Sequence, residues 1–149
     1  MSPLGPGTIA PPIPGVSFGE PTALFFYKVT CPVCQMAAPK VAGFERAYPG
    51  AIVGVGEDPP AKLERFDQEF GLGFASVPDL EPYDASNAYG LVSVPTLFVV
   101  GADGAIVSTV ESWDRDAYNE ASRVLAGLLR RPYAEISNAA DGLPAFRPG

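Results

Sequence analysis

Thr22 to Cys34, which reads Thr-Ala-Leu-Phe-Phe-Tyr-Lys-Val-Thr-Cys-Pro-Val-Cys, is the stretch that decides the fold. Residues 22–28 form a continuous apolar run, typical of a strand that is buried on both faces of a parallel or mixed sheet. Pro32 stands where the next helical pattern begins, and a proline at the first helical position is already set to the helical φ. The sequence therefore predicts a buried strand that leads into a helix with Cys31 at its N-cap.

Cys31 and Cys34 are the only cysteines of the chain. A bridge between them would close a very small loop and stabilise little, so the pair suits chemistry better than structure. At a helix N-terminus, backbone N–H groups and the helix dipole stabilise a thiolate on Cys31. Cys34 lies one turn later, where it can attack a mixed disulfide on Cys31 and release the bound partner. Half of a metal site and two small core residues are the alternative interpretations.

The composition excludes several classes of function. The 149-residue chain has no histidine, which excludes Ser-His-Asp hydrolases, Cys-His proteases, His-ligated zinc and proximal-His haem. We therefore expect neither a metal nor a cofactor. The net charge of −7 argues against nucleic acid or an anionic membrane as a partner. No stretch approaches the ~20 consecutive apolar residues of a membrane span.

Residues 1–17 contain neither a basic region nor an apolar region of the kind found in secretory signals. A cytoplasmic location is therefore expected. A periplasmic location stays open if a leader is missing from this sequence.

The patterns along the chain predict three segments. Residues 1–20 are a Pro/Gly-rich N-terminal arm, which we expect to be extended and to lie on or off the domain. Residues 21–131 are an α/β domain, and residues 132–149 form a tail whose structure the pattern does not predict. After the first strand, the expected elements are a helix from 32 to 48 kinked at Pro39, a strand at 51–55, a helix at 61–70, a strand at 75–80, a helical turn at 84–89, a hairpin of strands 96–100 and 105–110, and a helix capped by Asp114 that ends near 131.

Three motifs, in order, resemble the thioredoxin-like superfamily over about residues 20–131. Phe26–Cys34 matches the family's aromatic strand running into Cys-x-x-Cys, and Gln35–Pro39 matches the stretch with the helix-kinking proline. Val94-Pro95-Thr96 matches its cis-proline signature. The resemblance implies an α/β thioredoxin-like fold, with a central mixed β-sheet flanked by helices, and a cis-proline loop beside the cysteines. It also implies that Val94 and Pro95 bind substrate, through main-chain pairing with an extended segment.

The long connection between Cys34 and Pro95 contains an expected extra strand and helix within residues 70–89. This insertion before the cis-proline is similar to the redoxin branch, which includes TlpA/ResA-type thiol-disulfide oxidoreductases and AhpC/TSA peroxiredoxins. Peroxiredoxins carry Pro-x-x-x-Thr/Ser-x-x-Cys. When Cys34 is aligned with the cysteine of this motif, Tyr27 stands in place of the proline and Cys31 in place of the Thr/Ser. The resemblance therefore implies a thiol-disulfide oxidoreductase first, and a thiol peroxidase with antioxidant activity as the alternative.

The resemblance also shows a departure. Thioredoxins place a buried acid six residues before the first cysteine, and Phe25 stands there in this chain. Glu57 and Asp58 are candidate substitutes as proton acceptors for the second cysteine, or they begin a solvated loop. Lys28 is a candidate for lowering the pKa of Cys31, or its stem packs at the strand end with the ammonium in water.

The intact cysteine pair favours an oxidoreductase over a non-catalytic binding module on the same scaffold. The expected partners are protein or small-molecule disulfides or thiols, together with an unidentified redox partner. Two residues between the cysteines are too few to predict a reduction potential, so the direction of electron flow stays open.

Overall fold

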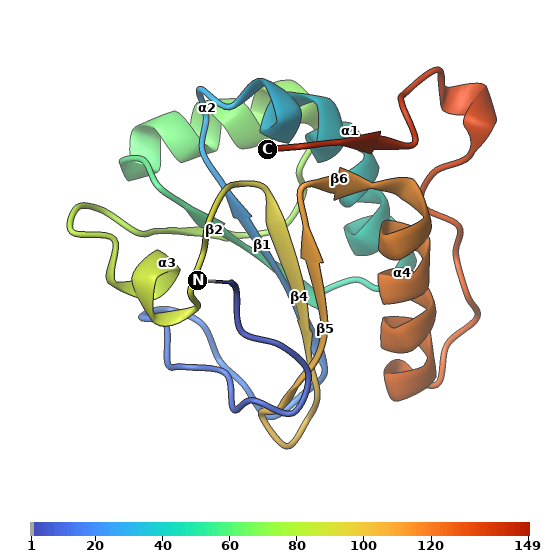
Figure 1. Ribbon diagram of the computed structural model, residues 1–149, viewed down its shortest axis with the longest axis horizontal. Helices are drawn as coiled ribbons and strands as arrows, with labels where there is room; N and C mark the ends of the chain where they lie inside the picture. The colour runs from blue at the N-terminus through green and yellow to red at the C-terminus, as the bar shows by residue number, and fades with distance from the viewer. Residues whose placement is uncertain (1) are drawn as a thin grey trace.

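The computed structural model describes residues 2–149 and has a mixed β-sheet at its centre (Figure 1). Its elements are β1 (Thr22–Tyr27), α1 (Pro32–Ala47), β2 (Ile52–Gly56), α2 (Pro60–Phe70), β3 (Ser76–Pro78), α3 (Asp84–Ala88), β4 (Thr96–Val100), β5 (Ile106–Glu111), β6 (Trp113–Asp114), α4 (Arg115–Leu129), a 3₁₀ turn (Ala139–Asp141) and β7 (Phe146–Arg147). Five strands form the main sheet in the order β3-β2-β1-β4-β5. The pairs β1–β2 and β2–β3 are parallel, whereas β1–β4 and β4–β5 are antiparallel.

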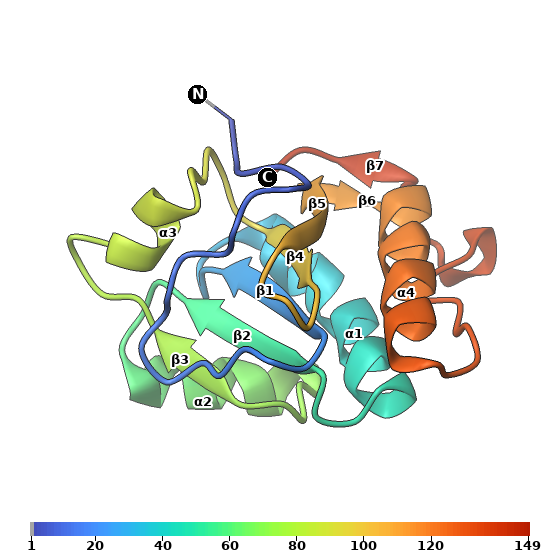
Figure 2. The same cartoon turned by 90° about the horizontal axis from the view of Figure 1, so that it is seen from below.

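β1 is the central strand, and every one of its residues is buried. Because side chains alternate along a strand, its two sets of residues pack against different layers. Phe25 and Tyr27 belong to the core shared with α1, α2 and α4. Leu24 and Phe26 belong to a second core, which α3 and the N-terminal arm cover. Figure 2 shows the arm, in dark blue, crossing one face of the sheet, with α1 and α4 to the right of it.

The N-terminal arm lies on the domain. Its Ile13 is buried, and the N–H of Ala10 donates to the carbonyl of Gly104 at 2.9 Å. Around Thr8 the arm exchanges backbone hydrogen bonds with Ile106, and Ile9 forms an isolated antiparallel bridge with Ala105. The prolines lack N–H donors, so the arm makes scattered backbone bonds in place of a continuous ladder.

The expected helices and strands occur in the expected order, with small changes at their ends. Cys31 is the N-cap of α1, which contains Pro39, and Asp114 caps α4 by accepting a 3.1 Å hydrogen bond from the N–H of Ala117. The strand of the insertion is shorter than expected, Ser76–Pro78, because it pairs only at the edge of the sheet beside β2.

Residues 132–149, for which the sequence predicted no structure, run back along α4. Asn119 of that helix holds the tail through its side chain, which accepts from the N–H of Ile136 at 2.8 Å and of Ser137 at 3.1 Å. The tail then pairs its β7 antiparallel with β6. This return brings the last residues of the chain over the end of the sheet where α1 begins (Figure 2).

Candidate active site

Cys31 and Cys34 lie at the start of α1, directly after the loop that follows β1. Cys31 is the N-cap of the helix, and Cys34 lies in its first turn. Cys31 has the extended backbone of an N-cap, with φ −81° and ψ 116°, and its Sγ accepts a 3.2 Å hydrogen bond from the N–H of Cys34. Two further side chains fix the connecting loop at Val29. Gln35 Nε2 donates to the carbonyl of Val29 at 2.9 Å, and Asp58 Oδ2 accepts from its N–H at 2.9 Å. The loop between β1 and α1 is therefore held through both the carbonyl and the N–H of Val29.

The two thiols differ in exposure and in acidity. The pKa of Cys31 is lowered to about 6, chiefly by a hydrogen bond from the Cys34 thiol, and further by the N–H groups of Cys34 and Val33 and by the charge of Arg147, whereas partial burial opposes the shift. Burial raises the pKa of Cys34, which is fully buried, and its hydrogen bond to Cys31 and the charge of Glu57 act in the same direction. At neutral pH, Cys31 is the thiolate and Cys34 is the thiol.

The loop before β4 completes the site. The Val94–Pro95 peptide bond is cis. The Sγ of Cys31 lies 3.5 Å from the carbonyl oxygen of Val94, to which the protonated thiol donates. The loop is anchored by Thr96, whose hydroxyl donates to the carbonyl of Ser93 at 2.9 Å, and by the N–H of Ser112, which donates to the carbonyl of Pro95 at 2.9 Å. The structure therefore brings together all four residues that the sequence predicted for the site: Cys31, Cys34, Val94 and Pro95.

The other candidate residues from the sequence have different places. Phe25 is buried in the core. Asp58 is also buried and binds backbone, so it does not begin a solvated loop. Glu57 follows β2, and its charge raises the pKa of Cys34 without a hydrogen bond to either thiol among the described residues. The Nζ of Lys28 lies 6.0 Å from the ring centroid of Tyr83, and Arg147 is the cation that lowers the pKa of Cys31.

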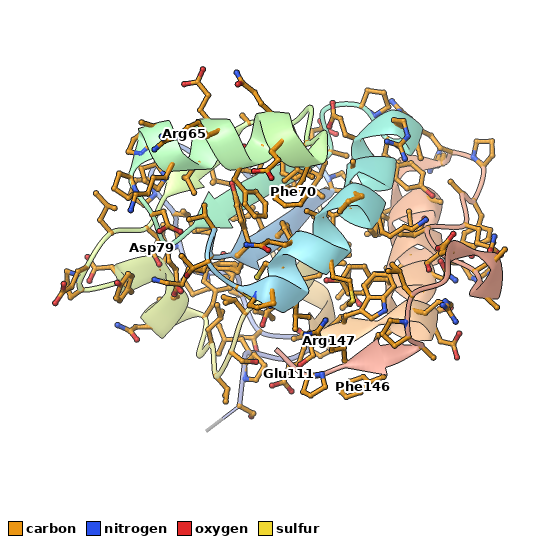
Figure 3. All side chains as sticks on the ribbon, turned by 90° about the horizontal axis from the view of Figure 1, so that it is seen from above. Arg65, Phe70, Asp79, Glu111, Phe146 and Arg147 are labelled. Atoms are coloured by element: carbon orange, nitrogen blue, oxygen red, sulfur yellow. The ribbon has the colours of Figure 1, made fainter. Side chains whose placement is uncertain are left out.

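Arg147 and Tyr118 are neighbours of the cysteines that the sequence analysis missed. Arg147 lies on β7 beside the first turns of α1 (Figure 3), with its Nη1 3.9 Å from the Sδ of Met36. Tyr118 of α4 is fully buried; its pKa is raised, chiefly by burial and also by the charges of Cys34 and Cys31. Neither residue has a local signal, because both reach the site only through the packing of the C-terminal third of the chain.

Residues 17–109 match the model of the AhpC/TSA family. The chain belongs to the AhpC/TSA family. The match spans the insertion and all four residues that the sequence predicted for the site, Cys31, Cys34, Val94 and Pro95. A comparison with curated proteins gave no significant match.

Solved structures of thiol-disulfide oxidoreductases share the fold of this AhpC/TSA protein. The thioredoxin domain of one from Bacteroides vulgatus is 21% identical, with 82% of this chain and 99% of that chain covered and a TM-score of 0.69. A secreted disulfide oxidoreductase of Mycobacterium tuberculosis, described as homologous to Escherichia coli DsbE, is 25% identical over 62% of this chain and 69% of that one, with a TM-score of 0.55. StoA from Bacillus subtilis is 26% identical over 64% and 76% of the two chains, with a TM-score of 0.54. The predicted thioredoxin-like fold is confirmed.

Two further features bear on function. Among residues 2–149, no helix is both long enough and apolar enough to cross a membrane. The same residues contain no group of three or more His, Cys, Asp or Glu side chains placed to hold a metal ion.

Proposed function

We propose that this AhpC/TSA-family protein is a thiol-disulfide oxidoreductase in which Cys31 is the nucleophile and Cys34 the resolving cysteine. The observation that carries the proposal is the contrast between the two thiols. Cys31 is partly exposed at a helix N-cap with its pKa lowered to about 6, and Cys34 is buried one turn inside. A nucleophile must be ionised and accessible, whereas a resolving thiol has only to reach its neighbour.

The exchange has two steps. The Cys31 thiolate attacks one sulfur of a disulfide R–S–S–R′; the S–S bond breaks and R′S⁻ leaves with its electron pair, which gives a mixed disulfide Cys31–S–R. Cys34 then loses its proton to the departing thiolate or to water and attacks Cys31 Sγ. RS⁻ leaves, and a Cys31–Cys34 disulfide forms. The dithiol is oxidised and the disulfide reduced to two thiols, and the reverse steps run with a dithiol reductant.

Val94 and Pro95 are proposed to hold the substrate next to Cys31. The carbonyl of Val94 lies 3.5 Å from the nucleophilic sulfur, so a substrate segment that hydrogen-bonds to the backbone of Val94 is held next to Cys31. When Cys31 ionises, its thiol no longer donates to the Val94 carbonyl. The carbonyl oxygen is then free to accept a hydrogen bond from an incoming substrate.

Trapping of the mixed disulfide tests the assignment of roles. Reduced Cys34→Ser protein is mixed with hydroxyethyl disulfide and examined by intact-mass spectrometry. We expect one stable adduct on Cys31, whereas wild-type protein proceeds to its internal disulfide and Cys31→Ser protein forms almost no adduct. Adducts that form equally well from Cys34 would overturn the roles, and wild-type protein that stays reduced would overturn the function.

A further inference from the structure

The last residues of the chain cross the candidate site. We call residues 145–149 the strap. Its carbonyl at Ala145 accepts a 2.9 Å hydrogen bond from the N–H of Arg115, and the N–H of Gly149 donates to Ser112 Oγ at 3.0 Å. Between these anchors, Arg147 pairs with Trp113 across the β6–β7 ladder. The strap is thereby tied at three points along its length.

At its far end, the strap lies against the loop that carries Val94 and Pro95. A Cβ placed on Gly149 would collide with the carbonyl oxygen of Val94 and would lie 3.3 Å from Pro95 Cδ. The backbone of Gly149 is therefore in contact with this loop, at a distance that only a residue without a side chain permits. The same Val94 carbonyl oxygen lies 3.5 Å from Cys31 Sγ.

We propose that the strap restricts Cys31 to small disulfides, because it occupies the main-chain edge that an extended polypeptide needs at Val94. The proposal rests on the oxidoreductase function proposed above. A client strand paired with Val94 would lie about 4.8 Å from it, as neighbouring strands do. The backbone of Gly149 already lies against Val94, so the client strand and Gly149 cannot both be there. A small disulfide needs only a path to Cys31, a residue that is partly exposed.

The strap is weakly held compared with the rest of the fold. All of its residues are exposed, and the side chain of Phe146 points outward (Figure 3), with 56% of its surface accessible. Its attachments are a few backbone and hydroxyl hydrogen bonds, which each contribute about 1 kcal/mol net. A polypeptide client must therefore displace the strap, and this displacement slows its reaction without affecting a small disulfide.

Removal of Pro148 and Gly149 tests the proposal, because it clears Val94 and leaves the β6–β7 ladder and Arg147 in place. Second-order rates of the reduced protein are measured with hydroxyethyl disulfide and with disulfide-bonded insulin. We expect the insulin rate to rise about fivefold, as the loss of one anchoring hydrogen bond allows. The rate with hydroxyethyl disulfide is expected to stay within about twofold. Phe146→Ala, on the same strap but away from Val94, is the matched control and should change neither rate.

A second variant keeps the full chain. Ser112 has a positive φ of 65°, so Ser112→Gly removes the hydroxyl that anchors Gly149 without straining the backbone. It should raise the insulin rate in the same way. Unchanged insulin rates in both variants, with rapid reaction of hydroxyethyl disulfide, would overturn the role of the strap. Failure of wild-type protein to react with hydroxyethyl disulfide would instead overturn the oxidoreductase function.

Discussion

Cys31 Sγ lies 3.5 Å from the carbonyl oxygen of Val94, across 63 positions of sequence. The thiol donates to this carbonyl when it is protonated and loses that hydrogen bond when it ionises. Protonation of Cys31 is therefore coupled to what the Val94 carbonyl can accept. The strap touches the same carbonyl through Gly149, so one backbone oxygen lies next to both Cys31 and the C-terminal tail.

The first prediction concerns the pH dependence of Cys31. Its pKa is lowered to about 6, so the thiolate is gained as pH rises through that value and is nearly complete at pH 7.5. Iodoacetamide should label the reduced native protein once, on Cys31, at a rate that rises with a midpoint near pH 6 and then stays flat. Cys34→Ala removes the hydrogen bond that contributes most and should move the midpoint upward. A native midpoint near that of a free cysteine, about 8.5, would contradict the assignment.

Arg147 is predicted to favour the Cys31 thiolate by its charge. Arg147→Gln removes this charge and keeps the backbone of β7, so the midpoint of Cys31 alkylation should shift to higher pH. Arg65→Gln is the matched control, since Arg65 is exposed on α2 and far from β7 (Figure 3). The same shift in both variants would mean that net charge, and not the position of Arg147, sets the acidity.

Peroxidase activity is predicted to be weak compared with disulfide exchange. Cys34 stands at the peroxidatic position of the peroxiredoxin motif, but it is fully buried and its pKa is raised by burial, so little thiolate is available to hydrogen peroxide. Consumption of peroxide is measured with wild-type, Cys31→Ser and Cys34→Ser proteins. Rapid consumption that needs Cys34 and survives the loss of Cys31 would favour the peroxiredoxin alternative.

Ile13 of the N-terminal arm is predicted to be part of the core. It is 4% exposed against the sheet, whereas Ile9 of the same arm is 66% exposed. Ile13→Ala should lower the free energy of unfolding by about 2–5 kcal/mol, and Ile9→Ala should change it by less than about 0.5 kcal/mol. Urea denaturation measures both. Equal, small effects would show that the arm does not contribute to stability.

Tyr118 is predicted to tolerate loss of its hydroxyl. Its Oη is buried without a hydrogen-bond partner in the described part of the chain. Tyr118→Phe should leave the free energy of unfolding unchanged or raise it by about 1 kcal/mol. Tyr48 provides the contrast, because its hydroxyl lies 2.7 Å from Ser122 Oγ and accepts from the N–H of Ala134 at 3.1 Å. Tyr48→Phe should cost about 1–3 kcal/mol, and a similar loss for Tyr118→Phe would indicate a partner in solution.

The sequence by itself determined the strand–helix unit that carries the cysteines. A continuous apolar run, Pro32 at the first helical position and Cys31 before it are local signals, and local backbone preferences decide where α1 begins. The hairpin of β4 and β5 and the Asp114 cap of α4 are predictable for the same reason. Val94 and Pro95 were predicted from a family motif, and not from their own physical chemistry.

Tertiary structure alone decided what surrounds the thiols. Arg147 and the strap belong to a tail without hydrophobic periodicity, and it is ordered by hydrogen bonds to Asn119, Arg115 and Ser112. Such bonds depend on where an already folded helix and loop present their polar groups, so no local pattern in the tail predicts them. The same holds for the N-terminal arm, since its many prolines predict extended backbone but not the sheet face on which that backbone lies.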